Sequence, residues 1–132
     1  MTHSTAYEEH PQHRIEIDAA RVGIRVTLHG EILAQTTRGL NLREGNYPAV
    51  VYVPRDDVNM ERLTPSDLST HCPFKGDASY FRFQARSPEN SQQDSASKEV
   101  AWSYETPFDQ MAAIRGHLAF YSDRVTVEPL TD

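Results

Sequence analysis

A histidine, a cysteine and a lysine lie close together near the middle of the chain. Cys72 follows His71 directly, and Lys75 comes three residues later. Cationic neighbours lower the pKa of a thiol and raise its thiolate fraction, which makes Cys72 a candidate nucleophile. Structural burial is the competing interpretation, because adjacent side chains of extended backbone point to opposite faces and cysteine is among the most buried residue types. A third role open to Cys72 is to form part of the wall of a ligand site.

A second group of candidates carries charge. Arg55 follows a proline, Asp57 comes two residues later, and Glu44 lies upstream. A guanidinium group binds a carboxylate or a phosphate through its fork of N–H donors, and either acid could orient Arg55 or act as a general base. The competing interpretation is an internal ion pair between Arg55 and Glu44, with Asp57 as a helix cap.

Aromatic residues form the third group. Trp102 and Tyr104 are two residues apart, a spacing that places both on one face of a strand. Together with Tyr52 and Tyr121 they could stack on a flat ligand, or they could fill the core of a small β domain. Lys75 would then direct its ammonium group into the same hollow.

Short strands must position these candidates. Apolar and polar residues alternate along much of the chain, which is the pattern of half-buried strands. About eight strands are predicted, over 14–18, 21–28, 31–36, 49–53, 78–83, 100–104, 118–120 and 125–127. This number of short strands indicates a mainly β fold of antiparallel sheets.

Two short helices and one bend complete the predicted elements. Asp56 and Asp57 indicate a single N-capped helical turn, which is closed by a turn over 64–67. A second helix is expected to begin after Thr106 and to end at Gly116, because these residue types favour the two ends of a helix. Residues 72–76 are expected to form a bend.

The length of 132 residues fits a single domain. We expect a flexible N-terminal tail over 1–12, whose histidines and the adjacent His13 are solvated, and a β domain over 13–128. Within that domain, 86–99 is polar and is predicted to be a mobile loop. The start lacks the layout of a secretory signal, and no apolar stretch is long enough to span a membrane, which predicts a cytoplasmic protein.

Charge and cysteine content exclude several classes of function. Lys and Arg number 13 against 19 Asp and Glu, a formal net charge of -6. This balance argues against a nucleic acid or an anionic membrane as a partner recognised by bulk charge. The one cysteine excludes an intrachain disulfide and a zinc site built from cysteine pairs. No metal and no cofactor are predicted for this chain.

Four segments, taken together, resemble one known family. They are Glu-Gly-Asn-Tyr-Pro at 44–48 leading to Val-Tyr-Val-Pro-Arg-Asp-Asp-Val at 51–58, Thr-His-Cys-Pro-Phe-Lys-Gly at 70–76, Ala-Trp-Ser-Tyr at 101–104, and Ala-Phe-Tyr-Ser-Asp-Arg-Val at 119–125. The combination resembles the family catalogued as Domain of Unknown Function 427, over about Arg14 to Val127.

This resemblance implies a small β-rich fold of the β-tent type and a bacterial or fungal cytoplasmic setting, but no settled activity. The family has carried a nucleotidyltransferase label, yet the glycine-serine and paired-aspartate signature of polymerase-type transferases is missing from this chain. Related tents often hold zinc between two cysteine pairs. With one cysteine, this chain does not carry that feature.

Our first functional hypothesis is a small-molecule site in a concave sheet face. Arg55 and Lys75 would hold an anionic group, the aromatic residues would form the wall, and Cys72, Glu44 and Asp57 would supply any chemistry. A non-enzymatic interaction or structural module is the first alternative, and a nucleotidyltransferase-like or thiol-redox activity is the second. Homodimerisation through an exposed strand edge is compatible with each hypothesis.

Overall fold

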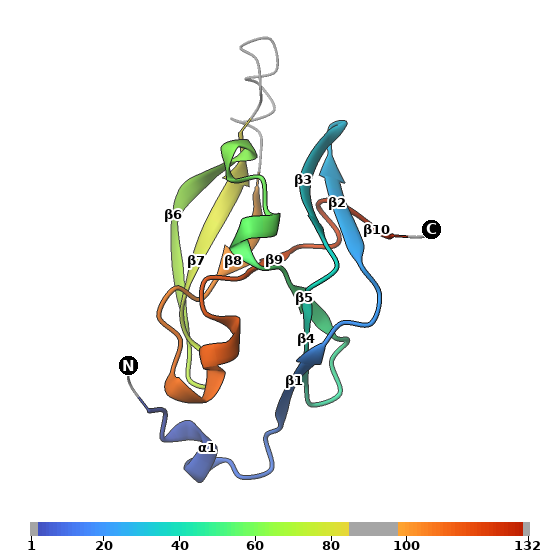
Figure 1. The fold of residues 1–132 in the computed structure, drawn as a ribbon. Coiled ribbons are helices and arrows are strands. Elements are labelled where there is room, and N and C mark those ends of the chain that lie inside the picture. Colours follow the sequence, from blue (N-terminus) through green and yellow to red (C-terminus); the bar gives the residue numbers. More distant parts are fainter. Residues whose placement is uncertain (1–2, 85–97, 131–132) are drawn as a thin grey trace.

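The computed structural model describes residues 3–84 and 98–130 of the chain (Figure 1). The strands within these residues are β1 Ile15–Ala19, β2 Ile24–Leu28, β3 Glu31–Thr36, β4 Leu40–Glu44, β5 Val50–Tyr52, β6 Leu63–Cys72, β7 Gly76–Phe83, β8 Glu99–Ser103, β9 Leu118–Phe120 and β10 Thr126–Pro129. The helices are α1 Ala6–Glu9 and the 3₁₀-helices η1 Arg55–Asp57, η2 Met60–Arg62 and η4 Asp109–Ile114. The predicted mainly β fold is confirmed, and the named strands all pair antiparallel.

The strands form three sheets. Their orders are β1-β4-β5, β10-β2-β3 and β6-β7-β8-β9. In Figure 1 the four-stranded sheet stands on the left and the two three-stranded sheets on the right. The first and third sheets are joined where Val53, just after β5, exchanges two backbone hydrogen bonds of 2.7 and 2.9 Å with Leu118 of β9. This junction fixes the angle between the two sheets that hold the candidate site.

Strand β6 corrects the sequence prediction, which places a closing turn at 64–67. The strand lies at the edge of its sheet, and its pairing with β7 is interrupted between Pro65 and Ser69. Proline has no N–H to donate to a strand ladder, so it is tolerated at sheet edges and at bulges. Pro65 therefore marks an irregularity within the strand and not its end.

Strand β4 is absent from the predicted elements, although its two leucines alternate with polar residues. It is the middle strand of its sheet, and its register pairs Glu44 with Ile15 of β1. This pairing brings the residues just before β1 close to Glu44. The N-terminal segment therefore reaches the candidate site through the sheet.

The predicted helix over 106–116 has a different form. Thr106 does not cap it: η4 begins after Phe108, and its 3₁₀ turns are interrupted by the non-helical backbone of Met111. Met111 and Ile114 are buried, so the segment packs against the core as its apolar residues indicate. The predicted turn at 56–57 is η1, which follows Pro54 and has no side-chain cap.

The segment expected to be an N-terminal tail carries α1 and contacts the turn at 73–74. The Ser4 hydroxyl donates to the carbonyl of Pro73, and the Tyr7 hydroxyl donates to the carbonyl of Phe74 at 2.7 Å. Burial raises the pKa of Tyr7 to about 12, with further contributions from Cys72 and Glu44. From Ser4 onward this segment is therefore tied to the β domain.

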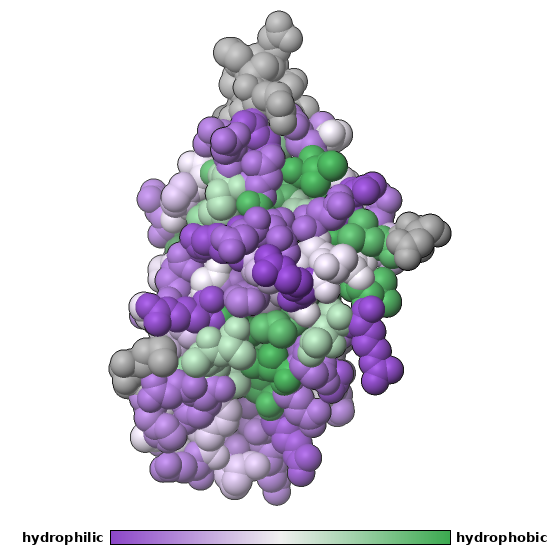
Figure 2. Space-filling view, viewed as in Figure 1, coloured by the Kyte–Doolittle hydropathy of each residue, from purple (hydrophilic) through white to green (hydrophobic). Residues whose placement is uncertain are grey.

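Two apolar clusters fill the interior. The first lies between the β10-β2-β3 sheet and the four-stranded sheet and includes Val26, Leu33 and Phe83. The second lies between the β1-β4-β5 sheet and the four-stranded sheet and includes Leu42, Tyr52 and Tyr104. Figure 2 shows hydrophobic side chains reaching the surface in a strip across its lower half, with hydrophilic side chains on both sides.

Two further predictions concern loops and membranes. The mobile loop expected over 86–99 lies outside the described residues as far as residue 97, and Glu99 begins β8. Across 3–84 and 98–130, no helix has both the length and the apolar character needed to cross a membrane.

Candidate functional site

A pocket of about 300 Å³ lies where the β1-β4-β5 sheet meets the four-stranded sheet. The side chains that line it come from β4, β5, β7, β8 and the adjoining loops. They are Leu42, Glu44, Tyr47, Pro48, Val50, Tyr52, Lys75, Tyr80, Trp102, Tyr104 and Tyr121. Six of these are predicted site residues: Glu44, Tyr52, Lys75, Trp102, Tyr104 and Tyr121. We call this hollow the aromatic pocket.

Aromatic side chains form most of the pocket wall, and they hold one another in place. Tyr80 of β7 pairs across the strands with Trp102 of β8, which puts both on one face of the sheet. The indole N–H of Trp102 donates to the Tyr52 hydroxyl at 3.1 Å, and its ring centroid lies 4.7 Å from that of Tyr121. The Tyr80 hydroxyl bonds to Thr70 at 2.8 Å. The wall is thus preorganised before any ligand binds.

A lysine and a glutamate form the polar end of the pocket. The Lys75 ammonium donates to Glu44 Oε1 at 2.6 Å, and the other Glu44 oxygen is 2.8 Å from Nε2 of His13. The side chain of Lys75 is 10% exposed, that of Glu44 22% and that of His13 29%. The His13 ring also stacks on Phe74 at 3.8 Å. The expectation of a solvated His13 is therefore wrong, because β1–β4 pairing brings it to Glu44.

The turn that places Lys75 depends on the residue that follows it. Gly76 has φ +118°, a backbone conformation that L side chains rarely adopt. The Lys75 carbonyl accepts a hydrogen bond of 2.9 Å from the backbone N–H of Phe108, which ties the turn to the segment before η4. The predicted bend at 72–76 is thus the β6–β7 turn.

Glu44 stays ionised because its partners outweigh its burial. Burial alone would raise its pKa, but the hydrogen bonds and charges of Lys75 and His13 hold the pKa below its usual value of 4.5. A lysine beside a carboxylate is able to exchange protons with a bound molecule, so this end of the pocket has the groups for acid–base chemistry.

We expect stability to fall in acid because of Glu44. A carboxyl group whose pKa is lowered in the folded state stabilises the fold fully above its unfolded pKa, and this contribution is lost as pH falls through the folded value. Urea unfolding of the wild type should therefore weaken more steeply below about pH 4.5 than unfolding of Glu44→Gln. Parallel slopes for the two proteins would contradict the inferred ion pair.

The tyrosines at the bottom of the pocket stay protonated. Burial raises the pKa of Tyr52 and of Tyr104, and nearby groups, among them Glu44 and Cys72, raise both further. Tyr52 accepts the hydrogen bond from Trp102. Tyr104 is only 7% exposed, yet its hydroxyl makes no hydrogen bond with any part of the chain that the structure describes. The hydroxyl oxygen is not among the buried unpaired atoms of the described residues, so it reaches the surface of the pocket, where it is a donor open to a ligand or to water.

Cys72 is not among the residues that line the pocket. It is half-buried, and its sulfur is 3.9 Å from the Lys75 nitrogen. It also packs against the second apolar cluster. No group of three or more His, Cys, Asp or Glu side chains forms a set of metal ligands among residues 3–84 and 98–130. The contact between its sulfur and the Lys75 ammonium is therefore the link between Cys72 and the pocket.

Arg55 does not join the pocket, and the predicted Arg55–Glu44 pair is wrong. Arg55 binds both oxygens of Glu105, at 2.8 and 2.9 Å, and donates through Nε to the carbonyl of Gly116. The physical reason is that Pro54 and η1, which begins at Arg55, direct the guanidinium to Glu105, whereas Glu44 pairs with Lys75 and His13. The Ser103 hydroxyl supports Glu105 in turn.

Because Arg55 is partly solvated, its loss should cost little. The side chains of Arg55 and Glu105 are 39% and 42% exposed. We expect Arg55→Ala to reduce the free energy of unfolding by about 1–2 kcal/mol, the sum of an exposed ion pair and one hydrogen bond to a carbonyl. Chemical denaturation measures this, with exposed Arg115→Ala as the control. A loss of several kcal/mol would show that the pair is a buried one.

Asp57 is also outside the pocket and does not cap a helix. It accepts hydrogen bonds from the Thr36 hydroxyl at 2.6 Å and from the Arg38 guanidinium. The hydrogen bond from Arg38, followed by that from Thr36, holds the pKa of Asp57 below its usual value. Its role is to fasten η1 to the end of β3.

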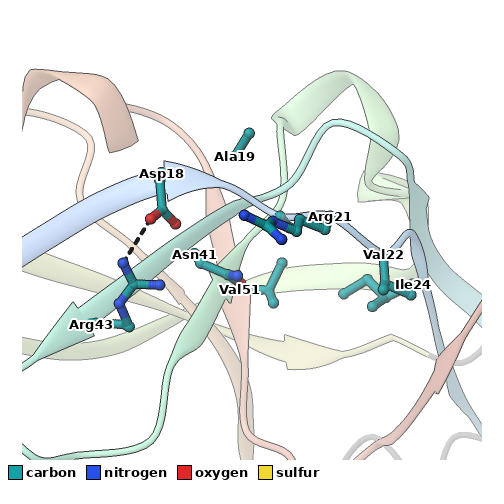
Figure 3. Close-up of a pocket in the computed structure, with 9 residues that line it drawn as sticks. Asp18, Ala19, Arg21, Val22, Ile24, Asn41, Arg43 and Val51 are labelled. Atoms are coloured by element: carbon teal, nitrogen blue, oxygen red, sulfur yellow. Dashed lines mark hydrogen bonds and ion pairs between the residues drawn. The ribbon is translucent and has the colours of Figure 1, made fainter.

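A larger hollow, of about 770 Å³, lies beside β1 and β4 (Figure 3). Arg43 lines it and binds Asp18 at 2.7 Å, as the dashed line in Figure 3 marks, and it also contacts Glu16. Asp18 and Arg21 are the other charged residues of the lining, Asn41 is polar, and the rest are apolar. Since Arg43 is engaged by two carboxylates, this hollow has less binding chemistry than the aromatic pocket.

Sequence reasoning missed several members of the site. Tyr47, Tyr80 and His13 all contact or line it, and Glu105 replaces Glu44 as the partner of Arg55. Tyr80 lies on a predicted strand that pairs with that of Trp102, and this pairing is the signal that would have included it. His13 could have been found only after β4 had been recognised and paired with β1.

Fold and site together define a small antiparallel β protein with an aromatic pocket closed at one end by a lysine–glutamate pair. The chain belongs to the family described as Domain of unknown function (DUF427), whose model matches residues 16–130. A search of curated proteins finds no significant match.

Proposed function

We propose that the aromatic pocket binds a small, flat aromatic molecule that carries a polar substituent. Five tyrosines and one tryptophan line it, and aromatic faces bind rings in stacked or edge-to-face arrangements. A volume of about 300 Å³ is at the lower end of the usual range for ligand pockets, which suits a ligand of one or two rings.

The charges that line the pocket favour a neutral aromatic ligand. They do not favour the anionic group that the first hypothesis places beside Lys75. Lys75 is the one cation in the pocket lining, and Glu44 already balances it at 2.6 Å. An anionic ligand would have to approach the Glu44 carboxylate as well. A neutral ring with an oxygen or nitrogen acceptor avoids this repulsion and still accepts a hydrogen bond.

The observation that carries the proposal is the unpartnered Tyr104 hydroxyl. This hydroxyl has no hydrogen-bond partner within the described residues and is accessible from the pocket, so it is free to donate to a ligand. Tyr104 is 7% exposed and lines the pocket. An acceptor on the ligand supplies the missing partner, while the Lys75 ammonium lies 6.0 Å from the Tyr104 ring and reaches the same region.

Trp102 provides the test, because it is the only tryptophan of the chain and lines the pocket. Its fluorescence should change in a saturable way on titration with phenol. Cyclohexanol matches phenol in size and hydroxyl group but lacks the aromatic ring, so it should bind at least about tenfold more weakly. Benzoate should be weaker than phenol because of Glu44. Equal responses to phenol and cyclohexanol would overturn the proposal.

Tyr104→Phe should weaken phenol binding about five- to tenfold, which is the effect of losing one hydrogen bond of ordinary strength. The same fluorescence titration measures this. Tyr7→Phe is the matched control, since its hydroxyl bonds to the Phe74 carbonyl outside the pocket. An unchanged affinity in Tyr104→Phe would remove that hydroxyl from the binding interaction.

A structural or interaction module is the second candidate function. It is favoured by the internal ion pairs of the three charged candidates, Arg55 with Glu105, Lys75 with Glu44, and Asp57 with Arg38. On this alternative the pocket is simply the rim of the second core. The absence of any saturable response of Trp102 to phenol or benzoate would support it.

A further inference from the structure

Another hollow, of about 280 Å³, borders the aromatic pocket at Val50, Trp102 and Tyr121. Its lining differs in character from that of the aromatic pocket, because nearly all of it is apolar. The residues are Ile24, Val26, Ala49, Val50, Val51, Trp102, Phe120, Tyr121, Ser122, Asp123 and Val127. We call it the apolar hollow. The loop after β9 provides its two polar members, Ser122 and Asp123.

The two hollows share part of their walls. Val50, Trp102 and Tyr121 line both. Trp102 is fixed by its hydrogen bond to Tyr52 and by its tilted contact with Tyr121, with 53° between the ring planes. A ring bound in the aromatic pocket would therefore contact three side chains that also border the apolar hollow, so the two hollows are neighbours.

The apolar hollow is open to solvent on one side. Val127 on β10 is 40% exposed, whereas Val26 and Phe120, deeper in the same wall, are 0% and 9% exposed. Apolar surface that remains in contact with water is stabilised by an occupant that removes it from water. The lining offers no cation, so an acidic substituent would gain nothing there.

We propose that the apolar hollow is a second subsite, which takes an aliphatic substituent of the ring bound in the aromatic pocket. The natural ligand class is then an alkyl-substituted aromatic compound with one polar group at the opposite end from the alkyl chain. This inference rests on the proposed function and adds the substrate class to it. The two hollows are neighbours at Val50, Trp102 and Tyr121, and the proposal requires that the alkyl chain passes between these side chains.

The test is a series of 4-alkylphenols from phenol to 4-hexylphenol, titrated against the full chain with Trp102 fluorescence as the readout. Each added methylene should increase the affinity about fourfold until the hollow is full. Ala49 is exposed, and it lines the apolar hollow but not the aromatic pocket. Ala49→Phe should therefore fill the hollow without disturbing the core. In that variant phenol should bind as before, and the gain with chain length should disappear.

Two further variants serve as controls for Ala49→Phe. Ala113→Phe places the same ring on an exposed alanine of η4 and should retain the chain-length gain. Val127→Ser makes the mouth of the hollow polar and should reduce the gain severalfold, which serves if Ala49→Phe does not fold. Phenol binding with no gain along the series overturns the second subsite alone. Failure of every phenol to bind overturns it together with the proposed function.

Discussion

Lys75→Met is expected to lower the free energy of unfolding by about 2–4 kcal/mol, because it leaves the partly buried Glu44 carboxylate without its main partner. The Lys75 side chain is 10% exposed and its ammonium lies 2.6 Å from Glu44. His13 still contacts the other carboxylate oxygen, which keeps the loss below that of a fully orphaned charge. Urea denaturation near pH 7 measures the effect.

The matched control is Lys98→Met, at the only other lysine of the chain, which is exposed. It should change stability by no more than about 0.5 kcal/mol. A double-mutant cycle with Glu44→Gln isolates the pair, and the double variant should be more stable than the sum of the single losses predicts. Additive losses would contradict a direct interaction between these two side chains.

Gly76→Ala is expected to cost about 2–4 kcal/mol, since strained backbone and crowding add together at this position. A Cβ built on Gly76 would lie 3.3 Å from the Cα of Pro107 and 3.4 Å from the carbonyl oxygen of Thr106. Both are backbone atoms, which yield less easily than the end of a flexible side chain. The same change should weaken phenol binding, because this turn positions Lys75.

Gly30→Ala separates the cost of backbone strain from the cost of crowding. Gly30 also has a positive φ, +79°, but a Cβ at this position would meet nothing within 4 Å. Its substitution should therefore cost only the conformational part, about 1–2 kcal/mol. Thermal unfolding of the two variants side by side gives the comparison. Equal losses would mean that contact with Pro107 and Thr106 has no part in the effect.

The aromatic half of the site could be predicted from sequence, for reasons that are local. Trp102 and Tyr104 are two apart, a spacing that places both on one face of extended backbone, and both line the pocket although β8 ends at Ser103, one residue before Tyr104. Lys75 is placed by the short turn that follows Cys72, which also depends on nearby residues alone. Such inferences succeed because they require only backbone geometry over a few residues.

The charged half could be predicted only in part, because ion pairs depend on which strands meet. Glu44 does line the pocket, as expected, but its partners Lys75 and His13 are 31 residues away on either side. Arg55 lies only three residues after Tyr52, yet Pro54 and η1 direct it to Glu105 instead. No spacing rule along the chain distinguishes these alternatives.

Strands β4 and β6 were not predicted, and the reason is similar for both. β4 is short and adjoins predicted loops, and β6 contains a proline that normally ends a strand. Both become clear only when their neighbours are known: β4 is flanked by β1 and β5, and β6 uses the freedom of a sheet edge. The general β architecture was therefore within reach of the sequence, whereas the pairing that builds the polar end of the pocket was not.

The indole N–H of Trp102 offers the most direct test of the pocket as a ligand site. A chain with one tryptophan gives one indole signal in a ¹H–¹⁵N spectrum, and this N–H lies at the pocket wall, bonded to Tyr52. We predict that phenol shifts this signal progressively to a plateau and that cyclohexanol leaves it nearly unchanged. A signal that stays in place up to millimolar phenol would contradict ligand binding in the aromatic pocket.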